Sequence, residues 1–248
     1  MHRKMKGVIS LVTLLLIYHL LTVFKVYNPY VLPPLKDIFF SLIELIKDRS
    51  IFFNVAISLK RVFLGFSISF LLASSITILE YMNKKISSYY DWFLQFMRNI
   101  PPLSLIPLLI LWFGIGEAPK LLIIILASFF PMYLNFQKGL SSCDKKLIEV
   151  GLVFKFSKKK IFFKIILPNA IPDILVGLRL GLGYSYRAII GAELIAASQG
   201  LGYMINFAKS MARIDIVIVG VVIIGLLGYL CDYIFKRLTI YDRNKRFN

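Results

Sequence analysis

Long apolar runs with few charged residues constrain this sequence more than any other feature. Crossing about 30 Å of hydrocarbon takes roughly 20 apolar residues in a helix that rises 1.5 Å per residue. Four runs approach that length, and they cover residues 7–24, 62–79, 99–116 and 121–137. Two more cover 174–193, which carries Arg179 and Arg187, and 216–231, which is short but uninterrupted. The sequence therefore predicts six membrane-spanning helices.

Composition agrees with a membrane protein and excludes two other classes. Apolar residues make up 58% of the chain, whereas soluble domains have roughly 45–50%. Lysine and arginine number 30 against 13 acidic residues, which gives a net charge of +17. A nucleic-acid-binding domain spreads such charge over a polar surface and has no use for long apolar runs. We therefore exclude a soluble enzyme and nucleic acid, and expect anionic lipid as a neighbour.

The orientation of the helices follows from the distribution of cations, since short cytoplasmic loops are enriched in lysine and arginine. With the N-terminus inside, 19 of these residues fall on the inner side and 9 on the outer side, while two lie within a span. Both termini are expected in the cytoplasm. A cleaved signal peptide is the alternative for the first run, but no small-x-small cleavage site follows it, so we expect a retained anchor.

Residues 35–48 form a shorter and different pattern. Asp37, Ser41, Glu44 and Asp48 alternate at helical spacing with leucine, isoleucine and phenylalanine. This pattern predicts an amphipathic helix. Its polar stripe has no partner in hydrocarbon, so we expect it to lie along the outer interface.

Residue types needed for several kinds of chemistry are missing. His2 and His19 are the only histidines, so the chain cannot assemble a zinc cluster or a histidine-dependent triad. No Gly-Lys pair is present, which excludes a phosphate-binding P-loop. Cys143 and Cys231 fall on the cytoplasmic side, where thiols stay reduced. If nucleotide powers this protein, another chain binds it.

The longest inner loop, residues 138–171, combines eight lysines with apolar residues such as Leu147 and Phe154. A basic segment that contacts anionic headgroups explains the lysines. It does not explain the apolar side chains, which require a partner surface.

Within this loop, the segment IEVGLVFKFSKKKIFFKIILP resembles the "EAA" signature of permease subunits of ATP-binding-cassette importers. That signature reads Glu-Ala-Ala, three residues, Gly, nine residues, Ile, one residue, Leu-Pro. Glu149 is the glutamate, two other residues replace the alanines, and Lys155 stands where glycine is expected. The coupling residues implied by the resemblance are Glu149, Val150, Gly151, Leu152, Lys155, Ile165, Leu167 and Pro168.

The resemblance extends over nearly the whole chain, through VLPPLKDIF, SLKRVFLGF, RNIPPLSLIPLLILWFGIG, GLRLGLG and AELIAASQGLGYMI. These runs look like the permeases that import nitrate, sulfonates, taurine and related solutes. The resemblance implies an all-α integral membrane protein with the six-helix, type I importer bundle. Residues 1–60 would hold the first span and the outer helix, 61–240 the permease core with the loop 138–171, and 241–248 a cytoplasmic tail.

The resemblance also implies partners and a mechanism. The chain would bind no cofactor; ATP and Mg²⁺ would sit on partner ATPase subunits, and an extracytoplasmic solute-binding protein would deliver the solute. A short coupling helix in the loop would transmit ATPase closure to the spans, and a homodimer in the plasma membrane, or bacterial inner membrane, is the simplest assembly. Lysine adopts a positive φ only with strain, so either the turn at Lys155 is built differently or coupling is weakened.

Arg179, Arg187 and Glu193 are candidates for the translocation pathway. Cations within a span are costly unless they are paired or face water. For Arg179, snorkelling to the inner headgroups is the competing explanation. For Arg187, the alternatives are contact with a small anionic solute or an ion pair with Glu193 or a neighbouring span.

Two other functions are kept as alternatives. A small polytopic membrane enzyme or assembly factor needs clustered acids, a nucleophile with a base, or metal ligands, and the carboxylates here are scattered. An ion-driven secondary transporter needs internal repeats and an acidic residue in the middle of a span. The sequence contains neither signal.

Overall fold

The computed structural model describes the backbone of residues 2–245 and the side chains of residues 9, 10 and 12–237. The described chain is helical throughout and contains no strand. In chain order, its elements are α1 His2–Val23, α2 Leu35–Lys47, α3 Ser50–Met82, α4 Ser87–Met97, η1 Pro102–Leu105, α5 Ile106–Phe113, α6 Glu117–Ser141, α7 Lys145–Val153, α8 Lys158–Ile161, η2 Phe162–Ile166, α9 Leu167–Ala196, α10 Leu201–Ser210 and α11 Ile214–Lys245. Here η1 is a 3₁₀ helix and η2 a π helix.

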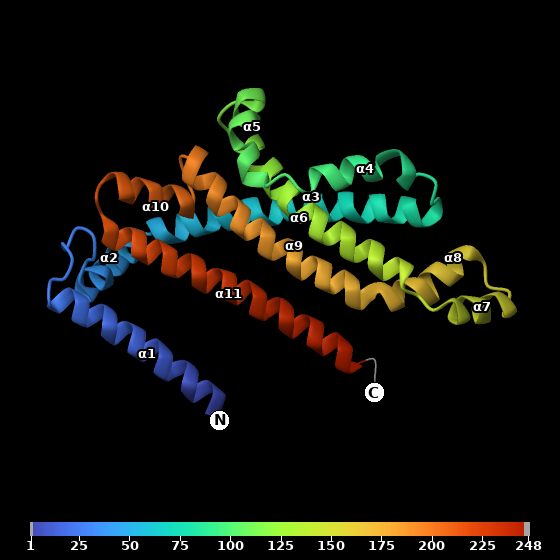
Figure 1. The fold of residues 1–248 in the computed structure, drawn as a ribbon, viewed down its shortest axis with the longest axis horizontal. Coiled ribbons are helices and arrows are strands. Elements are labelled where there is room, and N and C mark those ends of the chain that lie inside the picture. Colours follow the sequence, from blue (N-terminus) through green and yellow to red (C-terminus); the bar gives the residue numbers. More distant parts are fainter. Residues whose placement is uncertain (1, 246–248) are drawn as a thin grey trace.

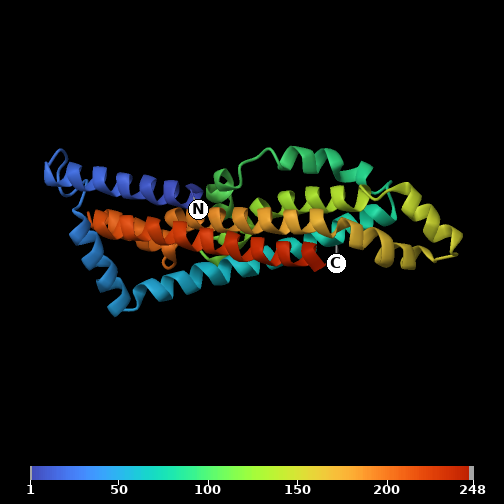
Figure 2. The same cartoon turned by 90° about the horizontal axis from the view of Figure 1, so that it is seen from below.

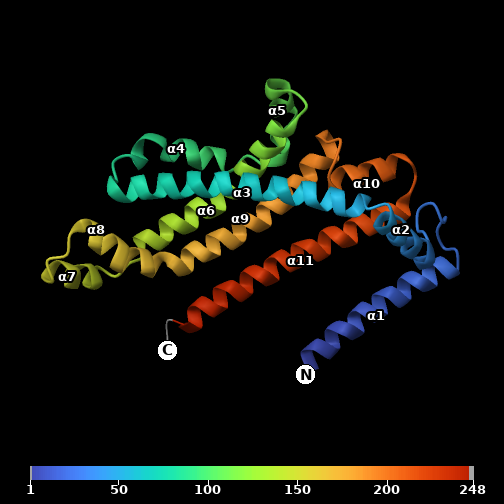
Figure 3. The same cartoon turned by 180° about the vertical axis from the view of Figure 1, so that it is seen from behind.

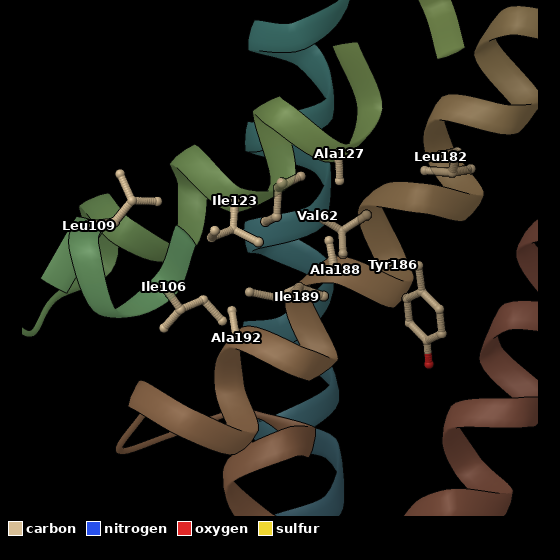
Figure 4. Packing of buried hydrophobic residues seen from close by; sticks show 11 residues of the cluster. Val62, Ile106, Leu109, Ile123, Ala127, Leu182, Tyr186, Ala188, Ile189 and Ala192 are labelled. Carbon is tan, nitrogen blue, oxygen red and sulfur yellow. The ribbon is translucent and has the colours of Figure 1, made fainter. Parts of the chain in front are cut away.

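Three long helices, α3, α6 and α9, form the centre of the molecule, and α11 packs along α9 (Figures 1 and 2). Their largest buried cluster joins Val62 of α3, Ile123 of α6 and Ile189 of α9 (Figure 4). Ile106 at the start of α5 enters the same cluster. The contact between α6 and α9 is the most extensive between any two described helices.

Small residues let the central helices approach closely. A Cβ atom added at Gly65 would lie 2.6 Å from Ile124, and one added at Gly177 would lie 2.9 Å from Asn135. At Gly181, the added atom would lie 2.7 Å from Met132. Membrane helices gain little from burying apolar surface against each other, because lipid is equally apolar, so close van der Waals packing at small residues holds them together.

Four of the six predicted spans are confirmed. The helices α3 and α6, the stretch Lys158–Ser210 that contains α9, and Ile214–Arg237 of α11 are each long and apolar enough to cross a membrane. They contain the predicted runs 62–79, 121–137, 174–193 and 216–231. The all-α prediction is likewise confirmed for the described residues.

The prolines in the predicted span over residues 99–116 favour a broken helix, and the structure has one, although its first piece begins earlier in the chain, at Ser87. Here Ser87–Met97 and Pro102–Phe113 form two helical pieces that are bent by 87°. Pro101 has extended backbone and Pro102 opens η1. Proline removes a backbone donor and disfavours helical geometry in the preceding residue, so two consecutive prolines end one helix and begin another. Counting the bent pair as one span gives five in the described chain instead of six.

The first predicted span, 7–24, corresponds to the single helix α1. Its apolar portion with described side chains is Val12–Val23, which is shorter than a full crossing. The side chains of residues 7, 8 and 11 lie outside the described set. A sixth span at this position therefore stays a prediction.

The amphipathic helix predicted at 35–48 is confirmed as α2. Figure 3 shows α2 beside α10 and the start of α11. Its apolar residues, among them Leu45, pack there in a cluster with Leu201 and Val219. On its polar side, Glu44 accepts a 2.9 Å hydrogen bond from Arg213. Hydrogen bonds to Asp215 and Glu44 raise the pKa of the Arg213 guanidinium, which therefore holds α2 to the α10–α11 turn as a permanent cation.

We expect valine at Gly177 to destabilise the bundle by roughly 1–3 kcal/mol, the usual range for overpacking, because its Cβ would lie 2.9 Å from the Asn135 Cβ. Gly183 on the same helix is the matched control, since a Cβ there has no neighbour within 4 Å. Thermal unfolding of the purified chain in mild detergent measures the difference. Equal melting temperatures for Gly177→Val and Gly183→Val would contradict the packing of α6 against α9.

Candidate functional site

The inner loop projects from one end of the molecule, beyond the ends of α6 and α9 (Figures 1 and 2). Both of its short helices have side-chain caps. Asp144 accepts a 2.9 Å hydrogen bond from the backbone N–H of Lys146 at the start of α7, and Ser157 accepts a 3.3 Å bond from Lys160 at the start of α8. Such caps satisfy donors that a helix start leaves without a partner, so the loop has defined geometry.

The turn after α7 resolves the question raised by Lys155. Lys155 has φ 52°, in the left-handed region. Its N–H donates to Leu152 O at 2.9 Å, and the N–H of Phe156 donates to Gly151 O at 3.0 Å. These two bonds define a Schellman motif, in which the residue after the helix is usually glycine. The turn is thus formed in the usual way, and the left-handed backbone conformation of Lys155 costs roughly 1–2 kcal/mol.

Gly151 fixes how α7 packs on the rest of the loop. A Cβ atom added there would lie 2.7 Å from Ile165 and 3.3 Å from Ile161. Ile161 and Ile166 belong to a buried cluster with Leu140 of α6 and Ala170 of α9, and Ile148 and Ile165 pack against it. The loop is therefore joined to both long helices by continuous apolar packing.

The opposite side of α7 is exposed and largely apolar. Glu149 lies on it without an ion pair among the described residues. Its large apolar members are Leu147, Val150, Leu152, Val153 and Phe154, with Val153 the most exposed at 80%. We call these six residues the α7 face.

The other predicted coupling residues lie behind this face. Ile165 is half-buried in η2, Leu167 begins α9, and Pro168 occupies the first turn of α9. Proline has no backbone N–H and cannot continue a regular helical hydrogen-bond pattern, and here it follows directly after the π helix η2. The structure thus brings Gly151, Lys155 and Ile165 together around one turn and leaves Glu149, Val150 and Leu152 at the surface.

Arg179 is held by an ion pair that neither explanation had foreseen. Its Nε and Nη2 donate to the two carboxylate oxygens of Asp232 in α11, at 2.6 and 2.7 Å. This two-point contact links α9 to α11. The partner was missed because Asp232 lies beyond the end of the predicted run 216–231.

Arg187 lines the same small cavity as Arg179. The cavity has a volume of about 150 Å³ and lies between α9 and α11. The Arg187 guanidinium lies 5.9 Å from the centre of the Tyr184 ring, and among the described residues it forms no ion pair. The expected pairing with Glu193 is therefore wrong.

Glu193 instead binds residues of α3 and the start of α10. Its carboxylate accepts hydrogen bonds from Ser58 Oγ at 2.7 and 2.9 Å, from Arg61 Nη1 at 2.8 Å and from the backbone N–H of Gly202 at 3.0 Å. Its side chain is fully buried. Gly200 leaves room for the carboxylate, because an added Cβ there would lie 2.3 Å from it. Three donor groups compensate the cost of burying this charge, with the single Ser58 hydroxyl hydrogen shared between the two carboxylate oxygens.

Arg61 joins a second carboxylate to the network. It donates from Nε and Nη2 to Glu117 at 2.7 and 2.6 Å, and Lys120 Nζ lies 3.0 Å from the same carboxylate. Its Nη1 also donates to Gln199 O at 2.8 Å. The resulting cluster of Arg61, Lys120, Glu117 and Glu193, which we call the charge cluster, connects α3, α6 and α9.

The charge cluster is the part of the site that the sequence reasoning missed. Arg61 and Lys120 were assigned to outer loops, because the predicted spans began at 62 and 121, whereas α3 begins at Ser50 and α6 at Glu117. A signal was available: Asn54, Ser58 and Arg61 recur at helical spacing within an otherwise apolar stretch. Asn54 accepts a 2.8 Å bond from Gly200 N, so this whole polar stripe faces the α9–α10 turn.

Comparisons with known proteins give a consistent result. A family model described as binding-protein-dependent transport system inner membrane component matches residues 65–239. A putative aliphatic sulfonates transport permease of Bacillus subtilis is 37% identical over 94% of this chain and 85% of its own length. The taurine transport system permease of Escherichia coli is 30% identical over 90% of this chain and 83% of its own length.

Two further similarities concern a more distant relative and the fold. A bicarbonate transport system permease of Synechococcus elongatus is 32% identical over 75% of this chain and 67% of its own length. Among solved structures, an inward-facing methionine ABC transporter covers 74% of this chain and 92% of its own, with a TM-score of 0.63 and 18% identity. That structural likeness establishes the fold alone.

We expect Lys155→Val to loosen the turn after α7, because a β-branched residue is strongly disfavoured at positive φ. A loss of about 1.4 kcal/mol in local stability speeds exchange of the amide hydrogens in this turn roughly tenfold. Lys155→Gly, which relieves the strain, should exchange no faster than the natural chain. Hydrogen exchange with mass spectrometry of peptides over the turn measures both. Equal exchange in Lys155→Val and the natural chain would contradict the left-handed conformation.

Proposed function

Because the chain belongs to the family of binding-protein-dependent transport system inner membrane components, we propose that it carries a small anionic or zwitterionic solute inward by alternating access. It is the multi-pass, membrane-embedded permease subunit of an ATP-binding-cassette importer, and it works with ATPase and solute-binding partners. ATP hydrolysis is carried out by the partner ATPase, so the chain itself is not an enzyme.

The observation that carries the mechanism is the α7 face. It is largely apolar and exposed, and α7 lies beyond the ends of α6 and α9. We propose that it docks on the ATPase, with Glu149 forming the ion pair and Val150 and Leu152 the apolar contact. Gly151, Lys155, Ile165, Leu167 and Pro168 would hold the coupling helix to α9. A membrane enzyme or assembly factor is not favoured.

The packing behind α7 supports its role as a lever. A partner drives a conformational change only through contacts that differ between the two states. The cluster of Leu140, Ile161, Ile166 and Ala170 connects the loop to α6 and α9 without a flexible linker. Movement of the α7 face would therefore move both central helices as packed units.

The names of the relatives support the solute class. Aliphatic sulfonates, taurine and bicarbonate are named for those proteins, and each contains a small oxyanion group. Arg187 lies beside a cavity and forms no ion pair with any described residue, and it is our candidate for contact with such a group in the pathway. Arg179 and Glu193 would shape the pathway by holding α11 and the α9–α10 turn.

The assembly and orientation are likewise proposed. One chain holds half of a pathway, which supports a pair of identical permeases. The start of α1 and the end of α11 both lie away from the end that holds α2 and α10 (Figure 1). Together with the excess of lysine and arginine on the inner side, this arrangement supports cytoplasmic termini. ATP and Mg²⁺ would bind the partner ATPases, and the lysine-rich loop would contact anionic lipid.

Glu149→Arg should weaken binding of the ATPase subunit, because a reversed charge at a docked surface costs several kcal/mol. We expect at least tenfold less ATPase to co-purify with the tagged variant from mild detergent, as measured by quantitative mass spectrometry. Asp37→Arg, the same charge change on exposed α2, is the control and should retain the ATPase. Full recovery with Glu149→Arg would remove Glu149 from the coupling surface.

Arg187→Gln should lower uptake of an anionic solute roughly tenfold, which corresponds to 1.4 kcal/mol of lost attraction. Uptake of a zwitterionic solute should fall less, since its net charge is zero. Vesicles containing the complete transporter and the binding protein allow both rates to be measured. Arg98→Gln, at an exposed arginine without an ion pair among the described residues, is the control. Unchanged uptake of the anion would exclude Arg187 from the pathway.

A further inference from the structure

The residues of the charge cluster that surround Glu117 differ from it in solvent exposure. The side chains of Arg61 and Lys120 are 6% and 4% exposed, whereas that of Glu117 is 57% exposed. Three of the hydrogen bonds in the cluster nevertheless converge on the Glu117 carboxylate. The two cations are thus fixed within the protein, while the anion between them is the group that reaches the surface.

The second carboxylate has partners of its own. Ser58 and Gly202 bind Glu193 without involving α6, and Arg61 binds Glu193 through Nη1 while its Nε and Nη2 bind Glu117. If Glu117 left, Arg61 and Lys120 would carry two positive charges against the single negative charge of Glu193. A buried site with one excess positive charge attracts an anion strongly, because few waters screen it.

The two glycines before Glu117 are not enclosed by other side chains. Gly114 has φ 74°, in the region that favours glycine, and an added Cβ at either Gly114 or Gly116 would meet nothing within 4 Å. Gly116 caps α6 without a side-chain hydrogen bond. The first N–H groups of this 25-residue helix therefore add their positive end to the same place.

We propose that Arg61, Lys120 and the first turn of α6 form an oxyanion subsite, which Glu117 fills when no solute is present and yields to the sulfonate or carboxylate group of a solute. The planar guanidinium suits this exchange, because it binds a carboxylate or a similar oxyanion through two parallel hydrogen bonds. In the empty transporter, Glu117 satisfies both cations, so no charge remains uncompensated between transport cycles.

This proposal rests on the proposed function and adds to it a specific solute contact. The ligand chemistry is a small organic oxyanion with one negative charge, matching the single charge that Glu117 supplies. The site also differs from the cavity beside Arg187, because it joins α3, α6 and α9 and includes no residue of α11.

The test measures anion binding by the permease in complex with its ATPase, purified in detergent without anionic lipid. The probe is methanesulfonate, compared with an equal concentration of sodium chloride and with the neutral analogue methanesulfonamide. Thermal unfolding at increasing probe concentration gives the concentration for half-maximal stabilisation, because a ligand that binds the folded protein raises its melting temperature. The variants are Glu117→Gln, Lys120→Gln and their combination.

Glu117→Gln removes the competing charge, so half-maximal stabilisation by methanesulfonate should need at least tenfold less probe than in the natural protein. Lys120→Gln alone should need at least fivefold more, which keeps the proposal testable if Glu117→Gln does not fold. In the double variant, the tenfold decrease in the half-maximal methanesulfonate concentration should disappear. Asp173→Asn is the matched control: it removes a carboxylate paired with exposed Lys138 at 2.9 Å and should behave as the natural protein.

Three results would overturn the subsite. The first is a half-maximal methanesulfonate concentration that is no lower in Glu117→Gln than in the natural protein. The second is an equally low concentration in the double variant, and the third is an equal decrease when the probe is methanesulfonamide. ATP-dependent solute uptake by the natural complex in vesicles separates this failure from failure of the proposed function. Normal uptake with any of the three results removes the subsite and leaves the importer. If no ATPase binds the permease and no uptake occurs, the proposed function is wrong, regardless of whether methanesulfonate stabilises the protein.

Discussion

The interior of a membrane supplies no hydrogen bonds, and the central part of this structure depends on how its polar groups find partners within the protein. Glu193 illustrates the constraint. Three donors, Ser58, Arg61 and Gly202, bind its buried carboxylate, and the structure places the start of α10 against α3 through these bonds. The close glycine contacts between α3, α6 and α9 bring these helices near enough to share such a cluster.

The inner loop shows a different use of packing. Its inner side merges with the apolar contacts of α6 and α9, while the α7 face stays open. A helix that is rigidly attached behind and apolar in front is suited to transmitting force between two proteins. The charge cluster and the loop lie at opposite ends of α9, so one continuous helix joins the site of ATPase contact to the region around the proposed oxyanion subsite.

How much of this could be predicted depends on whether a feature is local in the sequence. Apolar length and helical spacing predicted four spans and α2, because hydropathy is read along one segment at a time. The break within 99–116 is also local, because Pro101 and Pro102 interrupt the apolar run, but the helical piece Ser87–Met97 before it was not predicted as part of that span. The partners of Arg179 and Glu193 were not predictable in this way, since Asp232 and Arg61 lie far from them in the chain. Arg61 was further hidden by placing the start of the span one residue after it.

Lys155 has a consequence for how related chains are found. The turn after α7 is defined by two backbone hydrogen bonds, from Lys155 and Phe156, and not by the identity of the residue at its centre. Glycine is the least strained occupant, but a well-packed loop tolerates another residue there. A sequence search that requires glycine at this position would therefore pass over permeases that have the same turn, and divergence at a signature glycine is poor grounds for inferring that coupling has been lost.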